Sequence, residues 1–578
     1  MDTDHDGGGT DERPEAAPKK GLSRKTFVTG TVAAGAALGL GGTQALAKSG
    51  GGKAFATPKD GPGRQFEGLV LTKGRIHTFD GSNRVVEEVL IKNGRFAEVG
   101  NKVDRHPKYD VVNLKGKTVV PGLIEGHVHI VSLANRPGHH VVIEQATNIA
   151  EIQELLAARG PSVPEGQFIT AMGGWSTNYF AERRLPTLAE LDAAVSDRPV
   201  FIYQGGGGPA VTNSLGKAFF ESVSDAQAGP VVVSPEGFIA TGSPNQANRA
   251  LYHLRVRQTF DDRKRSTIDA MKYAASVGLT ANLDQVLPPA TTPLSPTQGL
   301  PNLDHFRMYD PWLAVHREGK TLVRLQMNFL HNQNDINLPE LKERLKNQFQ
   351  LFGDDMLMTG GIGEWGAPGD GVGPVWLEAQ RVIAQARWRN TNRTLRLTTL
   401  EAIVNGLEAV NAEFDITGLR WTVHHVQVAT PALLARLKAL NVGVQCGAWR
   451  YSSGTPTANG SPFRMVQESG IQNGIHMDGV HIAPLTPWFA LYYTTTGVNA
   501  LGVLINDGQQ ISRQDAMRLY TRENAWHLNM EDRLGTIEAG KLADLVVLDK
   551  DFTTCTDEEL KRMKPAITIV DGKVVYEG

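Results

Sequence analysis

The segment VVPGLIEGHVHI, from Val119 to Ile130, marks a change in the character of the chain. It begins with an apolar run that contains Pro-Gly and ends with His127 and His129, which are one residue apart. Because side chains of a β-strand alternate between its two faces, a strand here would direct both imidazoles to the same side. Such a pair is either part of a metal site or two ordinary histidines, and the surrounding sequence decides between these readings.

Short β-rich runs precede this segment and return at the end of the chain. LVLTKGRIHTFD, VVEEVLIKNGRFAEVG and YDVVNLKGKTVV contain or are separated by Lys-Gly and Asn-Gly turns, and LADLVVLDKD and AITIVDGKVVYEG have the same character. Runs of this kind are typical of short antiparallel strands. We therefore expect a small β-sandwich built from both chain ends, over residues 66–118 and 531–578.

Strands alternate with helices between these two ends. In TPALLARLKALNVGVQC, Thr430 is placed to cap a helix that begins with Pro431, and a strand from Val442 to Cys446 follows. TTLEAIVNGLEAVNA has apolar residues at helical spacing, and STIDAMKYAASVGLTANLDQ reads as a helix followed by a strand. The pattern predicts an α/β fold in which residues 119–530 form a (β/α)8 TIM barrel.

Composition narrows the classes of function. The 578 residues are 41% hydrophobic and carry a net charge of −2, so no nucleic-acid partner is expected. The two cysteines, Cys446 and Cys555, are far apart, which argues against a disulfide framework and a cysteine-rich zinc site. The 16 histidines supply another set of metal ligands.

The first 47 residues have the pattern of an export signal. A polar start is followed by SRKTFV, a small and apolar TGTVAAGAALGLGG, and an Ala45-Leu46-Ala47 cleavage site. The segment resembles a twin-arginine signal, with Arg24-Lys25 in place of two arginines. We expect an exported protein, periplasmic or secreted, with a linker over residues 48–65 and no stable membrane span after processing. The alternative is a disordered tail with an uncleaved anchor.

The segment PGLIEGHVH resembles the first metal-binding strand of the amidohydrolase superfamily. GGWSTNYFAERRLPTLAELDAAVSDRPVFI, LRWTVHHVQVATPALLARLKALNVGV and GTIEAGKLADLVVLD are similar to its YtcJ-like, or amidohydrolase-3, branch, and the likeness covers about residues 66–578. The resemblance implies a hydrolase of amide-like C–N bonds that acts on a small molecule. It also implies one or two divalent ions, commonly zinc, that activate a water.

The resemblance also implies ligands. His127 and His129 match the first-strand pair, His425 matches the sixth-strand histidine, and Asp478 matches the last-strand aspartate. In relatives that aspartate both binds metal and takes the proton of the water, so Asp478 is the expected catalytic residue. Strand alternation turns His424 away from His425, so we expect His424 to be a structural neighbour.

Three positions depart from the family pattern. The fifth-strand histidine should fall near Arg396 to Thr399, where none occurs. In TGGIGEWGAPGDG, Glu364 stands where relatives often carry a lysine; it is either an oxygen ligand or the partner of a nearby arginine. QGGGGPAVTNS, from Gln204 to Ser214, lacks the usual Asp-Gly-His and is interpreted as a flexible or close-packed substrate loop.

Other residues are candidates for the surroundings of the site. The aromatic residues at predicted strand ends either line a substrate pocket or pack in the core: Trp175, Tyr179, Trp365, Trp449 and Tyr451. Trp175, Trp365 and Trp449 are the substrate-binding candidates. Five further histidines are candidates for the rim of the site or for substitute ligands: His139, His140, His331, His476 and His481.

Two further functions stay open at this point. Deaminases, lactonases and other enzymes use the same site in this superfamily, and fold alone does not choose among them. A missing ligand is also compatible with a catalytically decayed barrel that acts as a binding or regulatory protein. The sequence leaves the substrate, the metal, the metal count and a homo-oligomeric state open.

Overall fold

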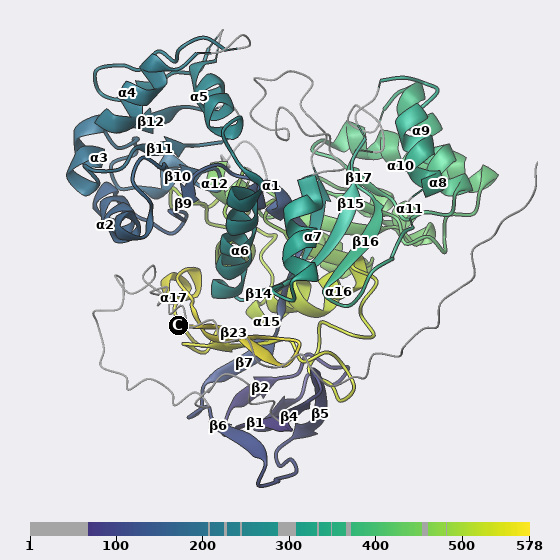
Figure 1. The fold of residues 1–578 in the computed structure, drawn as a ribbon. Helices are drawn as coiled ribbons and strands as arrows, with labels where there is room; N and C mark the ends of the chain where they lie inside the picture. Colours follow the sequence, from purple (N-terminus) through teal and green to yellow (C-terminus); the bar gives the residue numbers. More distant parts are fainter. Residues whose placement is uncertain are drawn as a thin grey trace, which may run out of the picture. The chain divides into compact units, whose positions relative to one another are not determined.

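The structure is a computed structural model with an α/β fold (Figure 1). It describes residues 67–205, 208–224, 228–242, 245–286, 308–331, 334–347, 349–365, 372–453, 460–480 and 482–578. The predicted export signal and the whole of the predicted linker, residues 48–65, lie outside these residues. Across the described part, no helix combines the length and apolar character needed to cross a membrane.

Two parallel four-stranded sheets carry the central part of the chain. The first has the order β16-β15-β14-β8, with β8 (Leu123–Val128), β14 (Leu279–Val286), β15 (Arg324–Phe329) and β16 (Leu357–Ile362). The second has the order β17-β18-β19-β20, with β17 (Thr391–Arg393), β18 (Thr422–His424), β19 (Gly443–Gly447) and β20 (Asn473–His476). Isolated parallel bridges link the sheets at both edges, between Val128 and Gly479 and between Ile362 and Asn390.

Helices follow most of these strands, as the sequence periodicity predicts. In α11 (Pro431–Ala439), the Thr430 side chain accepts a hydrogen bond from Leu433 N, and the apolar stripe of the helix is buried. The predicted stripe of α10 (Leu397–Glu413) is buried as well. The remaining longer helices of this region are α6 (Phe260–Ser276), α7 (Asp310–Arg317), α8 (Pro339–Asn347), α9 (Pro374–Gln385), α13 (Phe463–Ser469), α14 (Pro487–Thr496) and α15 (Arg513–Arg518). The short ones are α1 (Ile130–Ala134), α12 (Arg450–Ser453) and α16 (Asn524–His527).

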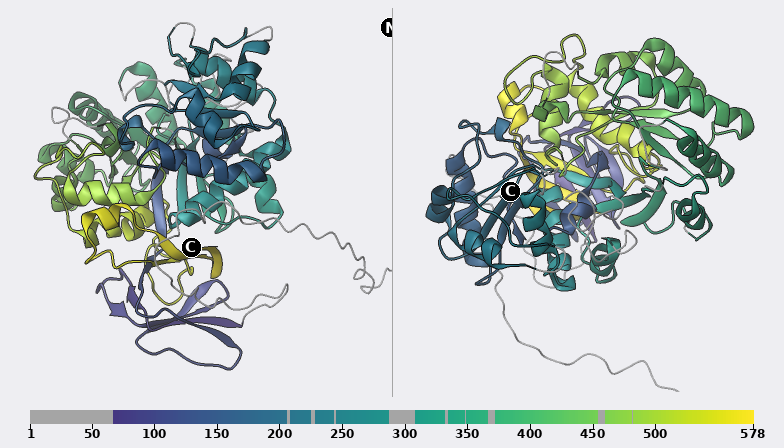
Figure 2. Two further views of the ribbon diagram at one scale, coloured as in Figure 1. Left: turned by 90° about the vertical axis from the view of Figure 1, so that its left-hand side faces the viewer. Right: turned by 90° about the horizontal axis from the view of Figure 1, so that it is seen from above.

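A separate five-stranded sheet is inserted between β8 and β14, in blue in Figures 1 and 2. Its order is β13-β12-β11-β10-β9, with β9 (His139–His140), β10 (Ile169–Met172), β11 (Val200–Tyr203), β12 (Ala210–Thr212) and β13 (Phe238–Ile239). It is accompanied by α2 (Ile149–Arg159), α3 (Leu188–Ala194), α4 (Ser214–Ser222) and α5 (Gln246–Arg255). Two apolar clusters belong to this insert alone, so it has a core of its own.

Strands from both ends of the described chain pair with one another, purple beside yellow in Figure 1. One sheet has the order β5-β4-β1-β6, with β1 (Gly68–Thr72), β4 (Glu88–Lys92), β5 (Arg95–Gly100) and β6 (Tyr109–Asn113). The other has the order β23-β22-β21-β7-β2-β3, with β2 (Arg75–His77), β3 (Val85–Val86), β7 (Thr118–Pro121), β21 (Leu545–Leu548), β22 (Pro565–Val570) and β23 (Lys573–Glu577). One apolar cluster, including Leu71, Val119 and Leu545, takes side chains from both sheets.

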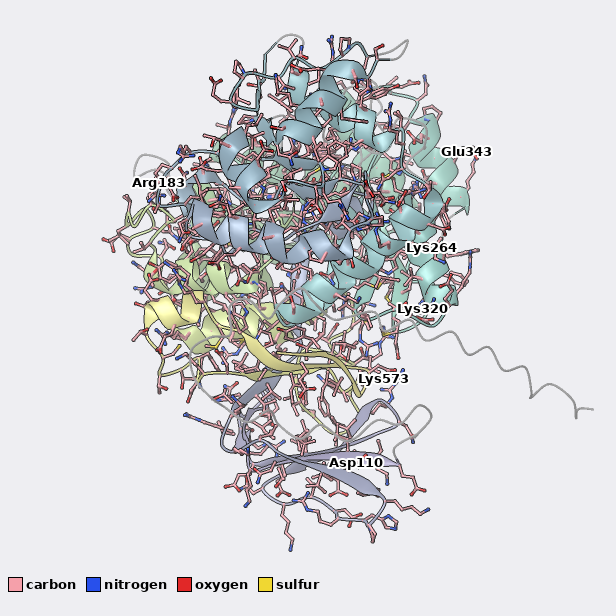
Figure 3. The ribbon with its side chains drawn as sticks, turned by 60° about the vertical axis from the view of Figure 1, so that its left-hand side comes forward. Asp110, Arg183, Lys264, Lys320, Glu343 and Lys573 are labelled. Carbon is pink, nitrogen blue, oxygen red and sulfur yellow. The ribbon has the colours of Figure 1, made fainter. Side chains whose placement is uncertain are left out.

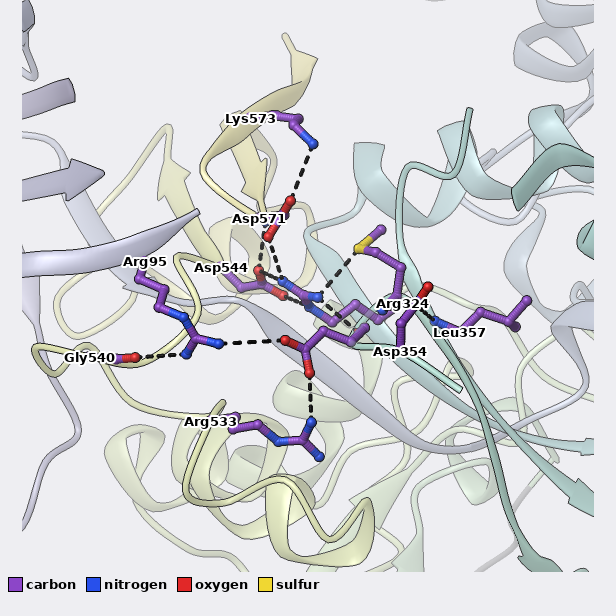
Figure 4. A network of polar contacts seen from close by, with 11 residues as sticks. Arg95, Arg324, Asp354, Leu357, Arg533, Gly540, Asp544, Asp571 and Lys573 are labelled. Atoms are coloured by element: carbon purple, nitrogen blue, oxygen red, sulfur yellow. Dashed lines mark hydrogen bonds and ion pairs between the residues drawn. The ribbon is translucent and has the colours of Figure 1, made fainter. Parts of the chain in front are cut away.

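A buried ion pair fastens the returning C-terminal segment to the parallel sheet (Figure 4). Arg324 of β15 donates through Nε and Nη2 to the two carboxylate oxygens of Asp544, each at 2.8 Å. Asp544 stands just before β21, and its backbone oxygen accepts from Gly122 N, at the entry to β8. The signature GTIEAGKLADLVVLD therefore carries the carboxylate that anchors the C-terminal strands beside the site-bearing strand.

Most other charged side chains lie on the outside of the molecule, away from the Arg324–Asp544 pair. Figure 3 shows Lys264, Lys320 and Glu343 on the outer helices or just after them. Lys320 Nζ lies 2.8 Å from Glu318, which also pairs with Lys264. Exposed pairs of this kind contribute little to stability, and their mixed signs agree with the near-neutral net charge.

Candidate metal centre

The two histidines of the opening segment occupy the end of β8. His127 lies within the strand and is 0% exposed, while His129 is the N-cap residue of α1 and is 3% exposed. Gly126 precedes them because a Cβ there would come within 2.6 Å of Gln445 Oε1. A side chain here would force Gln445 to shift, so the glycine lets the strand run close to its neighbours.

Five buried side chains from four strand ends meet at this point: His127, His129, Glu364, His425 and Asp478. His127 Nε2 lies 3.7 Å from Glu364 Oε2 and 3.8 Å from Asp478 Oδ1. His129 Nε2 lies 3.1 Å from Asp478 Oδ1, and His425 Nε2 lies 3.1 Å from Glu364 Oε2. The structure thus brings together all five residues that the sequence proposes as ligands.

His425 and Asp478 have left-handed backbones just beyond the ends of β18 and β20. Their φ angles are 57° and 58°, which is costly for residues with a Cβ. Strained conformations of this kind gather at functional sites, where the surrounding structure holds them. Each turn directs its side chain toward His127.

The prediction that strand alternation separates His424 from His425 is wrong. Strand β18 ends at His424, so the alternation does not extend to His425. The centroid of the His127 ring lies 5.0 Å from that of His424 and 4.5 Å from that of His425. Both imidazoles therefore contact His127, and His424 is a neighbour of the site, as expected for its role.

His127 of β8 and His129, just after it, each have a hydrogen-bond partner on Nδ1. His129 Nδ1 lies 2.6 Å from the backbone oxygen of Gln285 and donates to it, since a carbonyl only accepts. His127 Nδ1 lies 2.7 Å from His424 Nδ1. Partners of this kind on the far nitrogen are typical of metal-binding histidines, because they fix the orientation of the ring.

Burial and charge divide the protonation states of the cluster. Burial lowers the pKa of His127, His424 and His476 well below the usual imidazole value, and neighbouring imidazoles lower it further. Burial also acts to lower the pKa of His129, but Asp478 raises it to about 9.

Both carboxylates of the cluster are ionised at neutral pH. Burial acts to raise the pKa of Asp478 and of Glu364, but it is outweighed. Contact with His129 holds the pKa of Asp478 well below its usual range, and contact with His425 lowers that of Glu364. Two buried carboxylates beside imidazole nitrogens make a set of donors that suits a divalent cation.

The donor set fits such an ion. His127 Nε2 is fully buried and has no hydrogen-bond partner among the described residues, although it faces both carboxylates. Ligand atoms that lie close enough to share an ion form two groups, His127 with His129 and Glu364, and His127 with His425 and Asp478. Imidazole nitrogens and carboxylate oxygens together are ligands that zinc prefers.

The fifth strand ends before the place where the sequence expected its histidine. That histidine was expected near Arg396 to Thr399, but β17 spans Thr391–Arg393 and Leu397 already begins α10, so the expected position is not on the strand. The strand is short and polar, and its last residue is Arg393. Its guanidinium carbon lies 4.6 Å from the Trp365 ring centroid, and its charge contributes to the low pKa of Glu364.

The aromatic candidates divide by location. Trp365 follows Glu364 directly and is partly exposed, and Trp449 follows β19. Trp175 is buried in the insert and stacks on Phe180 at 5.7 Å, while the Tyr179 and Tyr451 ring centroids lie 5.9 Å apart. Substrate contact by Trp175, Trp365 and Trp449 stays a prediction.

Of the other histidines, His476 belongs to the cluster, since its Nε2 accepts from His425 N at 3.4 Å. His139 and His140 lie on β9 of the insert, and His331 Nε2 accepts from Arg344 Nε at 3.0 Å. His481 lies outside the described residues. The described part of QGGGGPAVTNS joins β11 to β12, and Asn213 caps α4, while residues 206–207 lie outside the described part.

Sequence reasoning missed two supporting groups. Asp284, in β14, is 0% exposed, and its Oδ2 accepts from Val131 N at 2.9 Å. Burial raises the pKa of Asp284 to about 7. Gln285 supplies the carbonyl for His129 and, through Oε1, accepts from Glu364 N at 3.2 Å. The strand predicted at the end of STIDAMKYAASVGLTANLDQ was the only signal that could have found these two groups. Nothing in the local sequence ties Asp284 to His129.

Comparison with known proteins agrees with this geometry. The model of a family described as the amidohydrolase family matches residues 110–576. An N-substituted formamide deformylase from Arthrobacter pascens is 22% identical over 558 residues, covering 89% of this chain and 99% of that protein.

Two solved structures are similar in fold. An uncharacterized metal-dependent hydrolase from Pyrococcus horikoshii OT3 has a TM-score of 0.56 at 17% identity, covering 85% of this chain and 99% of that one. Atrazine chlorohydrolase from Arthrobacter aurescens TC1, complexed with zinc, has a TM-score of 0.51 at 16% identity, over 88% and 95%.

Proposed function

Because this chain belongs to the amidohydrolase family, and is thus a metal-dependent hydrolase of C–N bonds, we propose that His127, His129, Glu364, His425 and Asp478 hold its divalent ion. The ion is zinc, as in the atrazine chlorohydrolase complex. We also propose that the eight strands of the two parallel sheets form a (β/α)8 barrel, with the edge bridges as its seams. The ligands then lie at the carboxyl ends of the strands, where barrel active sites are found.

The arrangement supports one ion. Both groups of candidate ligands contain His127 and use one of its ring nitrogens. The other, Nδ1, is engaged by His424, so only Nε2 is available. A nitrogen lone pair binds one metal ion, so the two groups are alternative descriptions of a single centre.

The residues of this chain divide the work of hydrolysis. The bound ion supplies Lewis acidity, which polarises a carbonyl and lowers the pKa of water from about 16 to about 7. Asp478 is the base: its carboxylate takes the proton of the attacking water and passes it to the leaving amine. Its low pKa keeps it ionised until that step. His129 Nε2, 3.1 Å from Asp478 Oδ1, gives its lone pair to the same ion and so keeps this carboxylate beside it.

The observation that carries this proposal is the buried His127 Nε2, which has no hydrogen-bond partner in the described part of the chain and faces two ionised carboxylates. The test is metal analysis of the purified chain, together with turnover of a panel of small N-substituted formamides and other amides. We expect about one equivalent of zinc. His127→Ala should lose the metal, and Asp478→Asn should lower kcat by about 10²–10⁴-fold. A chain that is active without metal, or an unchanged kcat in Asp478→Asn, would refute the mechanism.

The substrate class rests on the formamide deformylase, and we propose a small amide for this chain. We further propose export through residues 1–47. Fractionation of cells that express the wild type and an Arg24→Gln/Lys25→Gln variant tests this. Export predicts that the wild type leaves the cytoplasm and that the variant stays, and equal distributions would contradict it.

A further inference from the structure

We propose that His424 is a positioning residue that holds His127 in the tautomer with hydrogen on Nδ1, which leaves the Nε2 lone pair for the metal. The tautomer is a property of the chain itself, while its use in metal binding rests on the proposed function. His424 is placed by a hydrogen-bonded chain that runs away from the site through the protein interior.

The contact that starts this chain is short and fully enclosed. His127 Nδ1 and His424 Nδ1 are 2.7 Å apart, and both residues are 0% exposed. Water does not compete for either nitrogen. Two acceptors or two donors facing each other at this distance would repel, so one hydrogen lies between the rings.

The chain continues from the far side of His424. His424 Nε2 lies 3.1 Å from Thr422 Oγ1, and Thr422 Oγ1 lies 3.2 Å from Thr391 Oγ1. Asn328 Nδ2 donates to Thr391 Oγ1 at 3.3 Å, while Asn328 Oδ1 accepts from Gly361 N at 2.8 Å. The backbone N–H of Gly361 thereby fixes which end of the amide is the donor. Strands β18, β17, β15 and β16 all contribute to the chain.

Counting hydrogens assigns a direction. A neutral imidazole carries one N–H, and both rings are fully enclosed by the protein, where a charged ring is costly. Because the Thr422 hydroxyl donates its hydrogen to Thr391 Oγ1, Thr422 Oγ1 accepts from His424 Nε2–H. His424 Nδ1 is then an acceptor, and His127 Nδ1–H donates to it. His127 Nε2 then bears a lone pair directed between Glu364 and Asp478.

His129 shows the same outcome with a different partner. Its Nδ1 faces the Gln285 carbonyl, which can only accept, so one contact determines that Nδ1 carries hydrogen. His424 could either donate or accept, and it becomes an acceptor only through Thr422. The partner of His129 can therefore only accept a hydrogen bond, whereas the partner of His127 accepts one only because Thr422 takes the one N–H hydrogen of His424.

The first test compares His424→Asn with His424→Leu. The amide oxygen of Asn can accept near the position of Nδ1, while Leu cannot accept. The readouts are the ¹⁵N imidazole spectrum of metal-free protein, with the His127 signals identified by their loss in His127→Gln, and zinc affinity from chelator competition. We expect the Nδ1–H form of His127 in the wild type and in His424→Asn. We expect loss of that form in His424→Leu, with zinc affinity weaker by about 10–100-fold.

The second test leaves His424 in place, in case the Leu variant does not fold. Thr422→Val removes the hydroxyl that accepts from His424, and Thr422→Ser keeps it. Thr568→Val is the matched control, because this buried hydroxyl also makes a 2.8 Å hydrogen bond, to Ala275 O. We expect Thr422→Val alone to change the His127 spectrum and to weaken zinc binding by about tenfold.

The outcomes separate this inference from the proposed function. A His127 spectrum with hydrogen on Nε2 in the wild type overturns the inference, whatever the zinc affinity. So does a Thr422→Val variant with the spectrum and affinity of the wild type. A wild type that shows the Nδ1–H form but binds no zinc would refute the metal centre and still support the role of His424.

Discussion

Replacing Asp544 by Asn tests whether the C-terminal signature is an anchor. The exposed side-chain fractions of Arg324 and Asp544 are 2% and 3%, and two hydrogen bonds of 2.8 Å join them. Asn has the same shape but no charge, and it offers one acceptor where the carboxylate offers two. The variant therefore leaves a buried guanidinium without its counter-ion.

The size of the effect follows from what remains near Arg324. Breaking a buried pair by removing one partner costs about 3–5 kcal/mol of folding free energy. The closest other carboxylate is that of Asp571, 3.9 Å from Arg324 Nη2 and 33% exposed, so it compensates only in part. The Arg324 Nη1 bond to the Asp355 backbone oxygen, at 2.9 Å, is unaffected. We expect a loss near the lower limit, about 3 kcal/mol.

Urea unfolding at neutral pH measures this loss, and Asp355→Asn is the control. Asp355 pairs with Arg533 at 2.6 Å, but the two side chains are 32% and 31% exposed. A pair with this much solvent contributes up to about 1 kcal/mol. The reasoning fails if Asp544→Asn destabilises the protein no more than Asp355→Asn does. It also fails if Arg324→Met with Asp544→Leu is no more stable than Asp544→Asn alone.

Two further predictions concern buried positions near the insert and in β8. Burial raises the pKa of Glu144 to about 8 although Tyr273 and Leu485 N donate to it. This pKa exceeds the value of about 4.3 in the unfolded chain. The contribution of Glu144 to stability therefore falls as pH rises from about 4 to about 8, by up to about 1.4 kcal/mol per pH unit. Glu144→Gln should reduce the fall in stability between pH 5.5 and pH 8, measured from the midpoints of urea unfolding. The same fall in the variant and the wild type would contradict the raised pKa of Glu144. Gly126→Ala should lower the free energy of unfolding by about 1–3 kcal/mol, since the added Cβ meets Gln445 Oε1 at 2.6 Å. Gly418→Ala is the control and should be near neutral, because a Cβ there meets nothing within 4 Å. Equal stabilities of the two variants would contradict this prediction.

Sequence patterns predicted those helices whose caps and apolar periodicity match the way they pack in the fold. The α11 cap at Thr430 and the buried stripe of α10 follow from periodicity, because both helices bury one face against the sheet. The insert was not distinguished from its neighbours. Its strands and helices alternate as those of the parallel sheets do, and the antiparallel pairing of β12 with β11 and with β13 separates it from them.

The ligands were predicted from motifs, and the structure shows why alternation alone could not place them. The rule of opposite faces holds while residues stay in extended backbone, so it applies to His127, inside β8. His425 and Asp478 come after their strands end, at φ angles of 57° and 58°. Such a turn aims a side chain independently of the strand before it. Sites at strand ends are therefore where face counting fails, and the approach of both His424 and His425 to His127 is a direct consequence.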